Sequence, residues 1–331
     1  MKLSKKITDK IFFINNDLEF NDIALEIFRY QYIHNKVYND FVDHLKVNAY
    51  KIERYLDIPF LPVEFFKTRK VYTGEEPYDI IFLSSGTGNA VQSQHYVKDR
   101  QIYIKSFTMA FNLNYGDFED FVFLALLPSY LERKGSSLLF MTDHFIEQSS
   151  HKESGYFLYN HEELYALIQK LLQSNKRIFL FGVTFALTDF IAKYNIALRS
   201  NDIVMETGGM KGRKKEMIRE EVHHVLKAGF GISRIHSEYG MTELLSQAYS
   251  GGEGVFSCPP WLKVLVRDIN DPLCLFPANH SGGINIIDLA NIHSCSFLAT
   301  QDLGKVYENG NFEVSGRFDT SDIRGCNLLS I

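Results

Sequence analysis

Hydrophobic positions near the start of the chain recur at helical spacing. The apolar residues follow the i, i+3, i+4, i+7 pattern, and they are Phe20, Ile23, Ala24, Ile27 and Phe28. This pattern predicts an amphipathic helix. Because such a stripe is stable only when it is covered, the segment is expected to pack against a larger body.

Two further stretches have the periodicity of helices. One runs from Leu164 to Leu172 and the other covers about residues 214–227, where Gly229 is expected to end the helix. The inward positions expected for this last helix are Ile218, Val222 and Val225. His223 and His224 are adjacent on it, so they must point in different directions and do not suggest a shared metal site.

Continuous apolar runs indicate buried strands. One run begins at Phe121, another at Ile178, and a shorter one, DIIFL, at Asp79. None reaches the roughly 20 apolar residues of a membrane-spanning helix, so no membrane span is expected. Helical stripes alternate with these strands, which predicts mixed or parallel sheets flanked by helices.

The pattern changes to short strands after Trp261. In KVYENGNFEV, Asn309 and Gly310 separate two alternating runs, which is a strong signal for a β-hairpin. The sequence therefore predicts an α/β fold, with a body of mixed sheets flanked by helices and a β-rich C-terminal section. We treat 1–331 as a single domain, made of a helical N-terminal segment (1–70), an α/β body (71–255) and a β-rich section with a tail (256–331).

Composition excludes several function classes. The 331 residues contain 35 Lys and Arg against 40 Asp and Glu, and a net charge of -5 lacks the positive field that nucleic-acid binding requires. The N-terminal apolar run is too short for a secretion signal, so a cytoplasmic location is expected. The 4 cysteines form no Cys-x-x-Cys pair, which argues against a zinc site or a disulfide framework.

A loop of small polar residues follows the DIIFL strand. It supplies the hydroxyls of Ser84, Ser85 and Thr87, while Gly86 and Gly88 allow the backbone to approach a ligand closely. Successive N–H groups and hydroxyls of this kind can cradle phosphate oxygens. The loop matches neither the Walker pattern nor the dinucleotide pattern, and a simple turn is the alternative.

A second segment, HSEYGMTELLSQ, combines groups that suit a nucleotide. Tyr239 offers an aromatic face for a base, and Gly240 permits close approach. Thr242 and Glu243 offer a hydroxyl and a carboxylate for Mg²⁺. The alternative for this segment is a turn that opens a helix.

A third pair of segments, TQDLG and GRFDTSD, lies on either side of the expected hairpin. Asp302 can accept both hydroxyls of a ribose, and Arg317 can donate to a sugar or a phosphate. An exposed turn acid and a surface ion pair are the alternatives for these two residues.

In this order and spacing, SSGTG, YGMTE, TQDLG and GRFDTSD resemble the motifs of the adenylate-forming superfamily of acyl-CoA ligases. The resemblance covers most of the chain, and YGMTE is its most specific part. Gly208 and Gly209 fit the glycine strand that contacts adenine in that superfamily. FRYQYIHNKVYNDF, IPFLPVEFFK, ETGGMKGR and RGCNLL are most similar to the LuxE-type acyl-protein synthetases of the bacterial bioluminescence fatty-acid reductase.

The resemblance implies an enzyme that uses ATP and Mg²⁺ to activate a carboxylic acid, above all a fatty acid, as its acyl-adenylate, and then passes the acyl group to a protein thiol. It assigns the ATP phosphates to Ser84, Ser85, Gly86, Thr87 and Gly88. It assigns adenine to Gly208, Gly209, Tyr239 and Gly240. It assigns the metal to Glu243 with Thr242 beside it, and the ribose to Asp302 and Arg317.

The resemblance also implies that Cys326 carries the acyl group, since the bioluminescence synthetases use a cysteine near the C-terminus and Gly325 would let this tail swing. A terminal cysteine packed beside leucines is the alternative. Members of the wider superfamily use a lysine from a C-terminal domain, whereas this sequence ends shortly after the hinge motif. Lys211 and Arg213 are candidate replacements for that lysine, or else solvated surface charges.

Two other functions stay open. Free coenzyme A could replace Cys326 as acceptor, as in a ligase resembling phenylacetate-CoA ligase. A degenerate member that binds nucleotide without turnover is suggested by Asn89 and Ala90, where many relatives carry proline and lysine. For a protein thioester, a reductase or an acyltransferase is the expected acyl-accepting partner. His144 and His236 have no assigned role, although His236 could lie near the acyl group.

Overall fold

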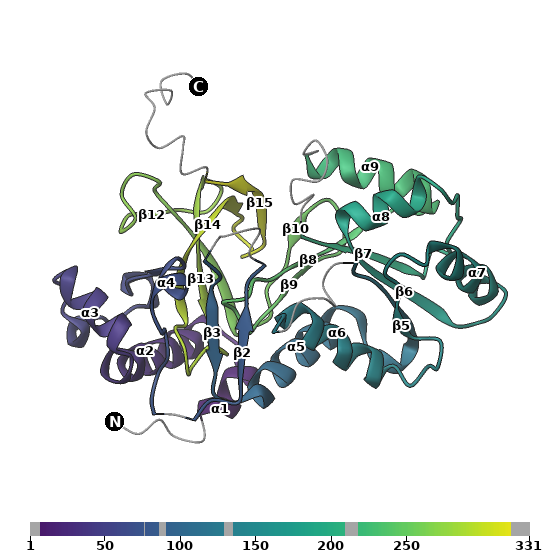
Figure 1. Ribbon diagram of the computed structural model, residues 1–331. Helices are drawn as coiled ribbons and strands as arrows, with labels where there is room; N and C mark the ends of the chain where they lie inside the picture. The colour runs from purple at the N-terminus through teal and green to yellow at the C-terminus, as the bar shows by residue number, and fades with distance from the viewer. Residues whose placement is uncertain (1–6, 76, 86–90, 129–134, 209–217, 319–331) are drawn as a thin grey trace. The chain divides into compact units, whose positions relative to one another are not determined.

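The computed structural model describes residues 7–75, 77–85, 91–128, 135–208 and 218–318. The chain divides into two compact units, one made of Met1–Gly74 with Pro260–Ile331 and the other of Glu75–Pro259 (Figure 1). Each unit has its own sheet. We refer to them as the split unit and the central unit.

In its described part, the central unit is built on a six-stranded sheet in the order β5-β4-β6-β7-β8-β9. The strands are β4 (Phe121–Leu126), β5 (Gly155–Tyr156), β6 (Arg177–Val183), β7 (Ile203–Thr207), β8 (His236–Tyr239) and β9 (Ala248–Ser250). Neighbouring strands are parallel except for β8 and β9. Strands β4, β6 and β7 are buried almost throughout, which explains their continuous apolar sequences.

Helices cover both faces of this sheet (Figure 1). They are α5 (Arg100–Tyr115) and α6 (Ser137–Gln148) on one face, and α8 (Thr184–Ile191) and α9 (Arg219–Phe230) on the other. Phe111 of α5 packs against Phe123 and Phe179, with ring centroids 5.6 and 5.3 Å apart. The helix α7 (His161–Leu172) precedes β6, as its periodicity predicts.

Two details of the sequence prediction are wrong. The apolar run from Ile178 is only half strand, because α8 begins at Thr184. In α9, Val222 is buried but Val225 is 41% exposed, and Ile218, which precedes the helix at the N-cap, is 63% exposed. The buried face of α9 instead includes His223 and Leu226 beside Val222, because the helix rests on the sheet through the stripe one position further along.

The end of α9 also differs from the prediction. The helix stops at Gly231, which has a φ of 63° and donates its N–H to Lys227 O. Gly229 lies within the helix, where an added Cβ would come within 2.6 Å of Ile191 Cδ1. Gly229 is therefore a packing residue, and Gly231 provides the left-handed C-terminal cap.

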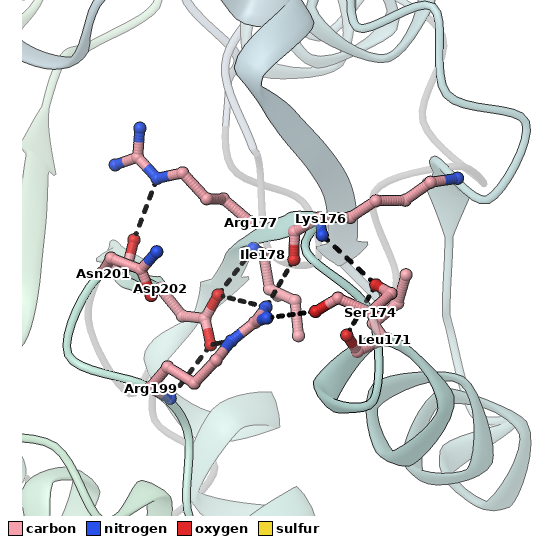
Figure 2. A network of polar contacts seen from close by, with 8 residues as sticks. All are labelled: Leu171, Ser174, Lys176, Arg177, Ile178, Arg199, Asn201 and Asp202. Atoms are coloured by element: carbon pink, nitrogen blue, oxygen red, sulfur yellow. Dashed lines mark hydrogen bonds and ion pairs between the residues drawn. The ribbon is translucent and has the colours of Figure 1, made fainter.

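A polar network fixes the amino ends of β6 and β7 (Figure 2). Asp202 accepts from Ile178 N at 2.8 Å and from three nitrogens of Arg199 at 2.9 to 3.0 Å. Arg199 donates in turn to Ser174 O at 2.7 Å and to Lys176 O. The carboxyl ends of β6 and β7, at the opposite edge of the sheet, are not part of this network and continue into loops. Parallel sheets usually bind ligands at these carboxyl ends.

A separate hairpin in the central unit consists of β2 (Ile80–Leu83) and β3 (Gln94–Val97). The same unit also contains the short strand β10 (Val255–Phe256) and the 3₁₀ turn η4 (Phe118–Asp120). Phe82 on β2 is fully buried and its ring lies 5.4 Å from Tyr103 of α5 and 5.6 Å from Phe140 of α6. The hairpin is thereby held on the helical layer.

The split unit contains a mostly antiparallel sheet in which the strands β15-β14-β13-β11-β12 are consecutive and β1 pairs in parallel with β14. The strands are β1 (Leu61–Pro62), β11 (Leu262–Arg267), β12 (Leu275–Phe276), β13 (Ser281–Asp288), β14 (Phe297–Val306) and β15 (Phe312–Arg317). Gly310, with a φ of 82°, forms the turn between β14 and β15, as the sequence predicts.

The N-terminal helices of the split unit are α1 (Ile7–Lys10), α2 (Asp17–His34), α3 (Lys36–His44) and α4 (Phe65–Thr68), with short 3₁₀ turns η1 (Ile11–Phe13), η2 (Ala49–Lys51) and η3 (Tyr55–Asp57). The predicted amphipathic helix is α2, which Asn16 caps by accepting from Glu19 N. Buried Gln31 of α2 donates to Asn291 O and Ile292 O. The α/β fold with a β-rich C-terminal section is thus confirmed.

Candidate functional site

The β2–β3 hairpin closes the loop that carries the SSGTG hydroxyls. Ser84 N donates to Ser93 O at 3.1 Å, and Ser93 N donates to the Ser84 hydroxyl at 2.8 Å. Ser85 is exposed, while Gly86, Thr87 and Gly88 lie outside the described residues. The Ser84 side chain therefore shapes the base of the loop, and Ser85 is the first residue beyond it.

Residues 239–243 form a turn between β8 and β9 in the same unit. Leu244 N donates to Met241 O at 3.0 Å, and the chain then enters β9 without forming a helix, which excludes the alternative of a helix start. Glu243 is 6% exposed, whereas Gly240 is open to solvent. The turn therefore presents a glycine outward and keeps its carboxylate within the fold.

His95 joins the hairpin to this turn. It lies on β3, is fully buried, and its Nδ1 donates to Thr242 O at 2.8 Å. The two residues are 147 positions apart in the sequence. A single buried hydrogen bond thus brings the strand that follows the SSGTG loop against the backbone of the YGMTE turn.

The glycine segment begins at the carboxyl end of β7. Gly208 has a φ of 66°, which favours glycine, and its carbonyl accepts from the Thr184 hydroxyl at 2.5 Å. The same hydroxyl lies 3.0 Å from Glu206 Oε2. Thr184, the first residue of α8, therefore holds the start of this segment, and Gly209 lies outside the described residues.

The pKa values of two carboxyl groups on adjacent strands are shifted in opposite directions. Burial raises the pKa of Glu206, but hydrogen bonds from His223 and Ser237 and the charge of Arg219 outweigh it, so this pKa is lowered. Burial, together with the charge of Glu206, raises the pKa of Glu238 to about 7, although a hydrogen bond from Thr207 opposes the rise. Glu206 is thus held as a carboxylate, while Glu238 titrates near neutrality.

In the split unit, Asp302 and Arg317 face each other across β14 and β15. They are register partners, and Arg317 Nε donates to Asp302 Oδ1 at 2.9 Å. The Asp302 side chain is 8% exposed and that of Arg317 is 70% exposed. Asp302 is therefore a buried carboxylate with one oxygen oriented by an arginine that reaches solvent.

The two histidines without an assigned role, His144 and His236, are both packed against aromatic rings. His144 packs against Phe107 at 5.2 Å, and burial lowers its pKa. His236 contacts the Tyr115 hydroxyl at 3.3 Å, and burial lowers its pKa to about 4, so it is neutral near pH 7. Both therefore behave as packed, neutral side chains.

The cysteines differ in burial. Burial raises the pKa of Cys295 to about 12, which disfavours a thiolate. Cys258 is half-buried, and Cys274 is an exposed free thiol. Cys326, Lys211 and Arg213 lie outside the described residues.

Within the described residues there is no group of three or more His, Cys, Asp or Glu side chains able to enclose a metal ion. Glu243 is therefore suited only to a cation that takes most of its ligands from elsewhere. The described helices include none that is long and apolar enough to cross a membrane.

Comparison with protein families now gives one match that spans nearly the whole chain. Residues 14–330 match the model of the family described as acyl-protein synthetase, LuxE. The chain belongs to the LuxE family. A search of curated proteins gives no significant match.

Solved structures similar to this LuxE chain are adenylate-forming ligases. ATP-bound MatB from Rhodopseudomonas palustris superposes with a TM-score of 0.55 at 16% identity, over 74% of this chain and 50% of its own. 2-Hydroxyisobutyryl-CoA ligase in complex with 2-HIB-AMP and CoA superposes with a TM-score of 0.63 at 12% identity, over 93% of this chain and 72% of its own. This LuxE chain thus shares their fold and spans about half the length of MatB.

The sequence analysis did not select several residues of the candidate site. It discounted His223 because its neighbour His224 points in a different direction, but His223 is 3% exposed and lies 3.6 Å from Glu206 Oε1. It did not select Glu206, Glu238 or His95. Glu206 and Glu238 stand directly before the TGG and YG segments, so a carboxylate at the end of a strand was the signal that could have identified them.

Proposed function

We propose that this chain activates a carboxylic acid as its acyl-adenylate with ATP and then transfers the acyl group to a protein thiol. The observation that carries the proposal is the LuxE acyl-protein synthetase match over residues 14–330. Two structural relatives support the adenylation step, because MatB is ATP-bound and the hydroxyisobutyryl-CoA ligase holds an acyl-AMP. A fatty acid is the substrate class expected from the family resemblance.

The first step joins a substrate carboxylate oxygen to the α-phosphorus of ATP, and the bond from that phosphorus to pyrophosphate breaks. Such a reaction depends on positioning and charge stabilisation and needs no protein nucleophile. The loop at residues 84–88 would bind the departing phosphates through hydroxyls and backbone N–H groups. The paired hydrogen bonds of Ser84 and Ser93 would keep the base of this loop rigid.

Mg²⁺ fits this site because it is usually bound by one or two carboxylates together with substrate phosphates. Glu243 would supply the carboxylate, with Thr242 beside it. The ion would neutralise charge on the phosphates. His95 would hold the Thr242 backbone, and therefore the turn that carries Glu243, through its 2.8 Å hydrogen bond.

The nucleoside would be bound by residues with matching chemistry. Tyr239 would lie against adenine, with Gly240 and the segment at 208–209 allowing close approach. Asp302 would accept the ribose hydroxyls through the oxygens that Arg317 orients, since Arg317 already donates to Oδ1. Arg317 is exposed enough to reach a sugar or phosphate oxygen as well.

The second step joins a thiolate sulfur to the acyl carbon and releases AMP, and the thiol proton passes to solvent. A thiolate is the side-chain nucleophile suited to this capture. Cys326 is our candidate carrier. Cys295 is less suited to the role, because burial raises its pKa and disfavours the thiolate. A reductase or acyltransferase would then accept the acyl group.

Intact mass of the protein after incubation with ATP, Mg²⁺ and a mixed set of carboxylic acids tests the proposal. We expect an ATP-dependent acyl adduct on the wild type that is absent from Cys326→Ala and retained in the matched control Cys274→Ala. ATP–pyrophosphate exchange across single acids then identifies the substrate. An adduct that persists in Cys326→Ala would remove this residue from the mechanism.

Coenzyme A is the second candidate acceptor, because the hydroxyisobutyryl-CoA ligase structure holds CoA. Exchange activity without any protein adduct, together with acyl-CoA formation when CoA is added, would favour that function. Binding of ATP without exchange for any acid would instead indicate a nucleotide-binding protein without turnover.

A further inference from the structure

Buried polar side chains beside the turn at 239–243 carry atoms without partners. Gln247 and Tyr249 are 3% and 2% exposed. Gln247 directly precedes β9 and Tyr249 lies on it, so these alternate residues project to the same side of the extended chain. Within the described residues, Gln247 Oε1 and the Tyr249 hydroxyl have no hydrogen-bond partner. Each buried polar atom without a partner lowers the stability of the fold by about 1 to 3 kcal/mol. Two such atoms on neighbouring residues therefore suggest a bound ligand that satisfies them.

Glu238 belongs to the same cluster. It is the register partner of Tyr249 across β8 and β9, so both side chains lie on one face of the sheet. An added Cβ on Gly240 would come within 2.5 Å of Glu238 Oε1 and 3.6 Å of Gln247 Nε2. The carboxyl of Glu238 and the amide of Gln247 therefore both lie against Gly240, in the turn that also carries Glu243.

Two donors of this cluster and its surroundings, the Thr207 hydroxyl and the Gln247 amide, already have acceptors. The Thr207 hydroxyl donates to Glu238 Oε2 at 2.5 Å. Gln247 Nε2 donates to the Tyr103 hydroxyl at 3.4 Å, and that hydroxyl donates to Ser137 O at 3.2 Å. The unmet groups are then the Gln247 carbonyl, which can only accept, and the Tyr249 hydroxyl, which can donate or accept, so a ligand group that satisfies the carbonyl must bring N–H or O–H.

We propose that Glu238, Gln247 and Tyr249 form a specificity site for a hydrogen-bond donor on the acid substrate, a hydroxyl or an ammonium group close to the activated carboxyl. The inference rests on the proposed function and narrows its substrate class from a plain fatty acid to a hydroxy or amino acid. The site lies against Gly240, in the turn that carries Glu243, the carboxylate proposed to hold Mg²⁺ at the reacting phosphates. An acid whose carboxyl reaches those phosphates would therefore read its donor here only if the donor is close to the carboxyl.

Matched acids test the proposal. ATP–pyrophosphate exchange is measured for short, medium and long straight-chain acids, each against its α-hydroxy, β-hydroxy and β-amino derivative. We expect the best derivative to exceed its parent acid by at least about tenfold in kcat/KM, because a site built to hydrogen-bond a group rejects the analogue that lacks it. Comparison of the hydroxy and amino derivatives identifies which hydrogen-bond donor the site binds.

Variants tie the preference to these residues. Gln247→Met keeps the side-chain length and removes the acceptor, and Tyr249→Phe removes one hydroxyl. Both are expected to lower the derivative-to-parent ratio by about tenfold, whereas Tyr159→Phe, at an exposed tyrosine, leaves it unchanged. Thermal melting of each variant confirms folding and reports binding of the same acids independently of turnover.

The outcomes separate the two proposals. Exchange that is equal for parent and derivative acids, or a preference that survives both variants, would overturn the specificity site while leaving acid activation intact. Absence of exchange with every acid would defeat acid activation itself. In that case a melting-temperature rise with a derivative but not its parent still supports the site, and no rise with either overturns it.

Discussion

At the scale of single residues, the carboxyl ends of β7 and β8 show how neighbours decide the charge of a buried acid. Glu206 points toward α9, where His223 lies 3.6 Å and Arg219 3.9 Å from its Oε1. Glu238 points to the other face, where Thr207 donates to it and no ion pair within the described part of the chain offsets its burial. The first therefore stays ionised, and the second titrates near neutrality.

Glu238 gives a pH-dependent prediction. Its pKa rises from 4.5 to about 7 on folding, so the native state binds the extra proton and the stabilisation, at most about 3 kcal/mol, is full below pH 4.5 and lost as the pH rises through 7. Glu238→Gln cannot ionise. We expect its melting temperature relative to wild type to increase steadily from pH 5 to pH 8.

The control for this series is Glu308→Gln, at an exposed glutamate of the split unit. Its melting temperature relative to wild type is expected to be constant over the same range. A Glu238→Gln difference that is also constant with pH would mean that this carboxyl is not the titrating group.

At the scale of elements, the two ends of the central sheet differ, because a polar network fixes one end and the other carries the candidate site. The amino ends of β6 and β7 are locked by Asp202 and Arg199, whose donors and acceptors are matched by backbone groups (Figure 2). The carboxyl ends lead to Gly208 and to the turn at 239–243. Rigid strands fixed at one end let short loops at the other end keep a precise geometry.

The Asp202 network gives a stability prediction. The Asp202 side chain is fully buried in its ion pair with Arg199, so Asp202→Ala leaves the half-buried Arg199 guanidinium without its carboxylate and Ile178 N without its acceptor. We expect a loss of about 3 kcal/mol in the free energy of unfolding, measured by urea denaturation. The matched control is Asp40→Ala, which breaks an ion pair with Lys36 whose side chains are 51% and 87% exposed.

The exposed pair is expected to cause no measurable change, because solvent screens it. If Asp202→Ala and Asp40→Ala unfold at the same urea concentration, the network of Figure 2 does not stabilise the sheet.

At the scale of the whole molecule, the residues proposed to bind ATP come from both compact units. Glu243 belongs to the central unit and Asp302 to the split unit, which the chain builds from its two terminal parts. A ligand that binds only the native state stabilises it by about 2.7 kcal/mol at a concentration 100 times its Kd. Melting temperature therefore reports nucleotide binding for the full chain.

We expect Mg²⁺ with ATP to raise the melting temperature, and we expect both Glu243→Gln and Asp302→Asn to reduce that rise. Glu162→Gln and Asp271→Asn are matched controls at exposed acids of the central and split units, and they should retain the full rise. A rise that is lost in Glu243→Gln but intact in Asp302→Asn would confine the nucleotide to the central unit and remove Asp302 from the proposal.

Elements with a local pattern could be predicted from the order of the amino acids alone. The apolar stripe of α2, the continuous strand β4 and the hairpin turn at Gly310 were predicted correctly, because periodicity and turn chemistry act between residues close in the chain. The order of the motifs also indicated the family, since each motif is a short contiguous segment.

Only the tertiary structure decided which side chains meet. His95 and Thr242 are 147 residues apart, and no local pattern encodes their hydrogen bond. The inward position of His223 and the opposite pKa shifts of Glu206 and Glu238 likewise depend on how α9 and neighbouring strands pack. Burial and charge act through space, so these properties exist only once distant segments have been brought together.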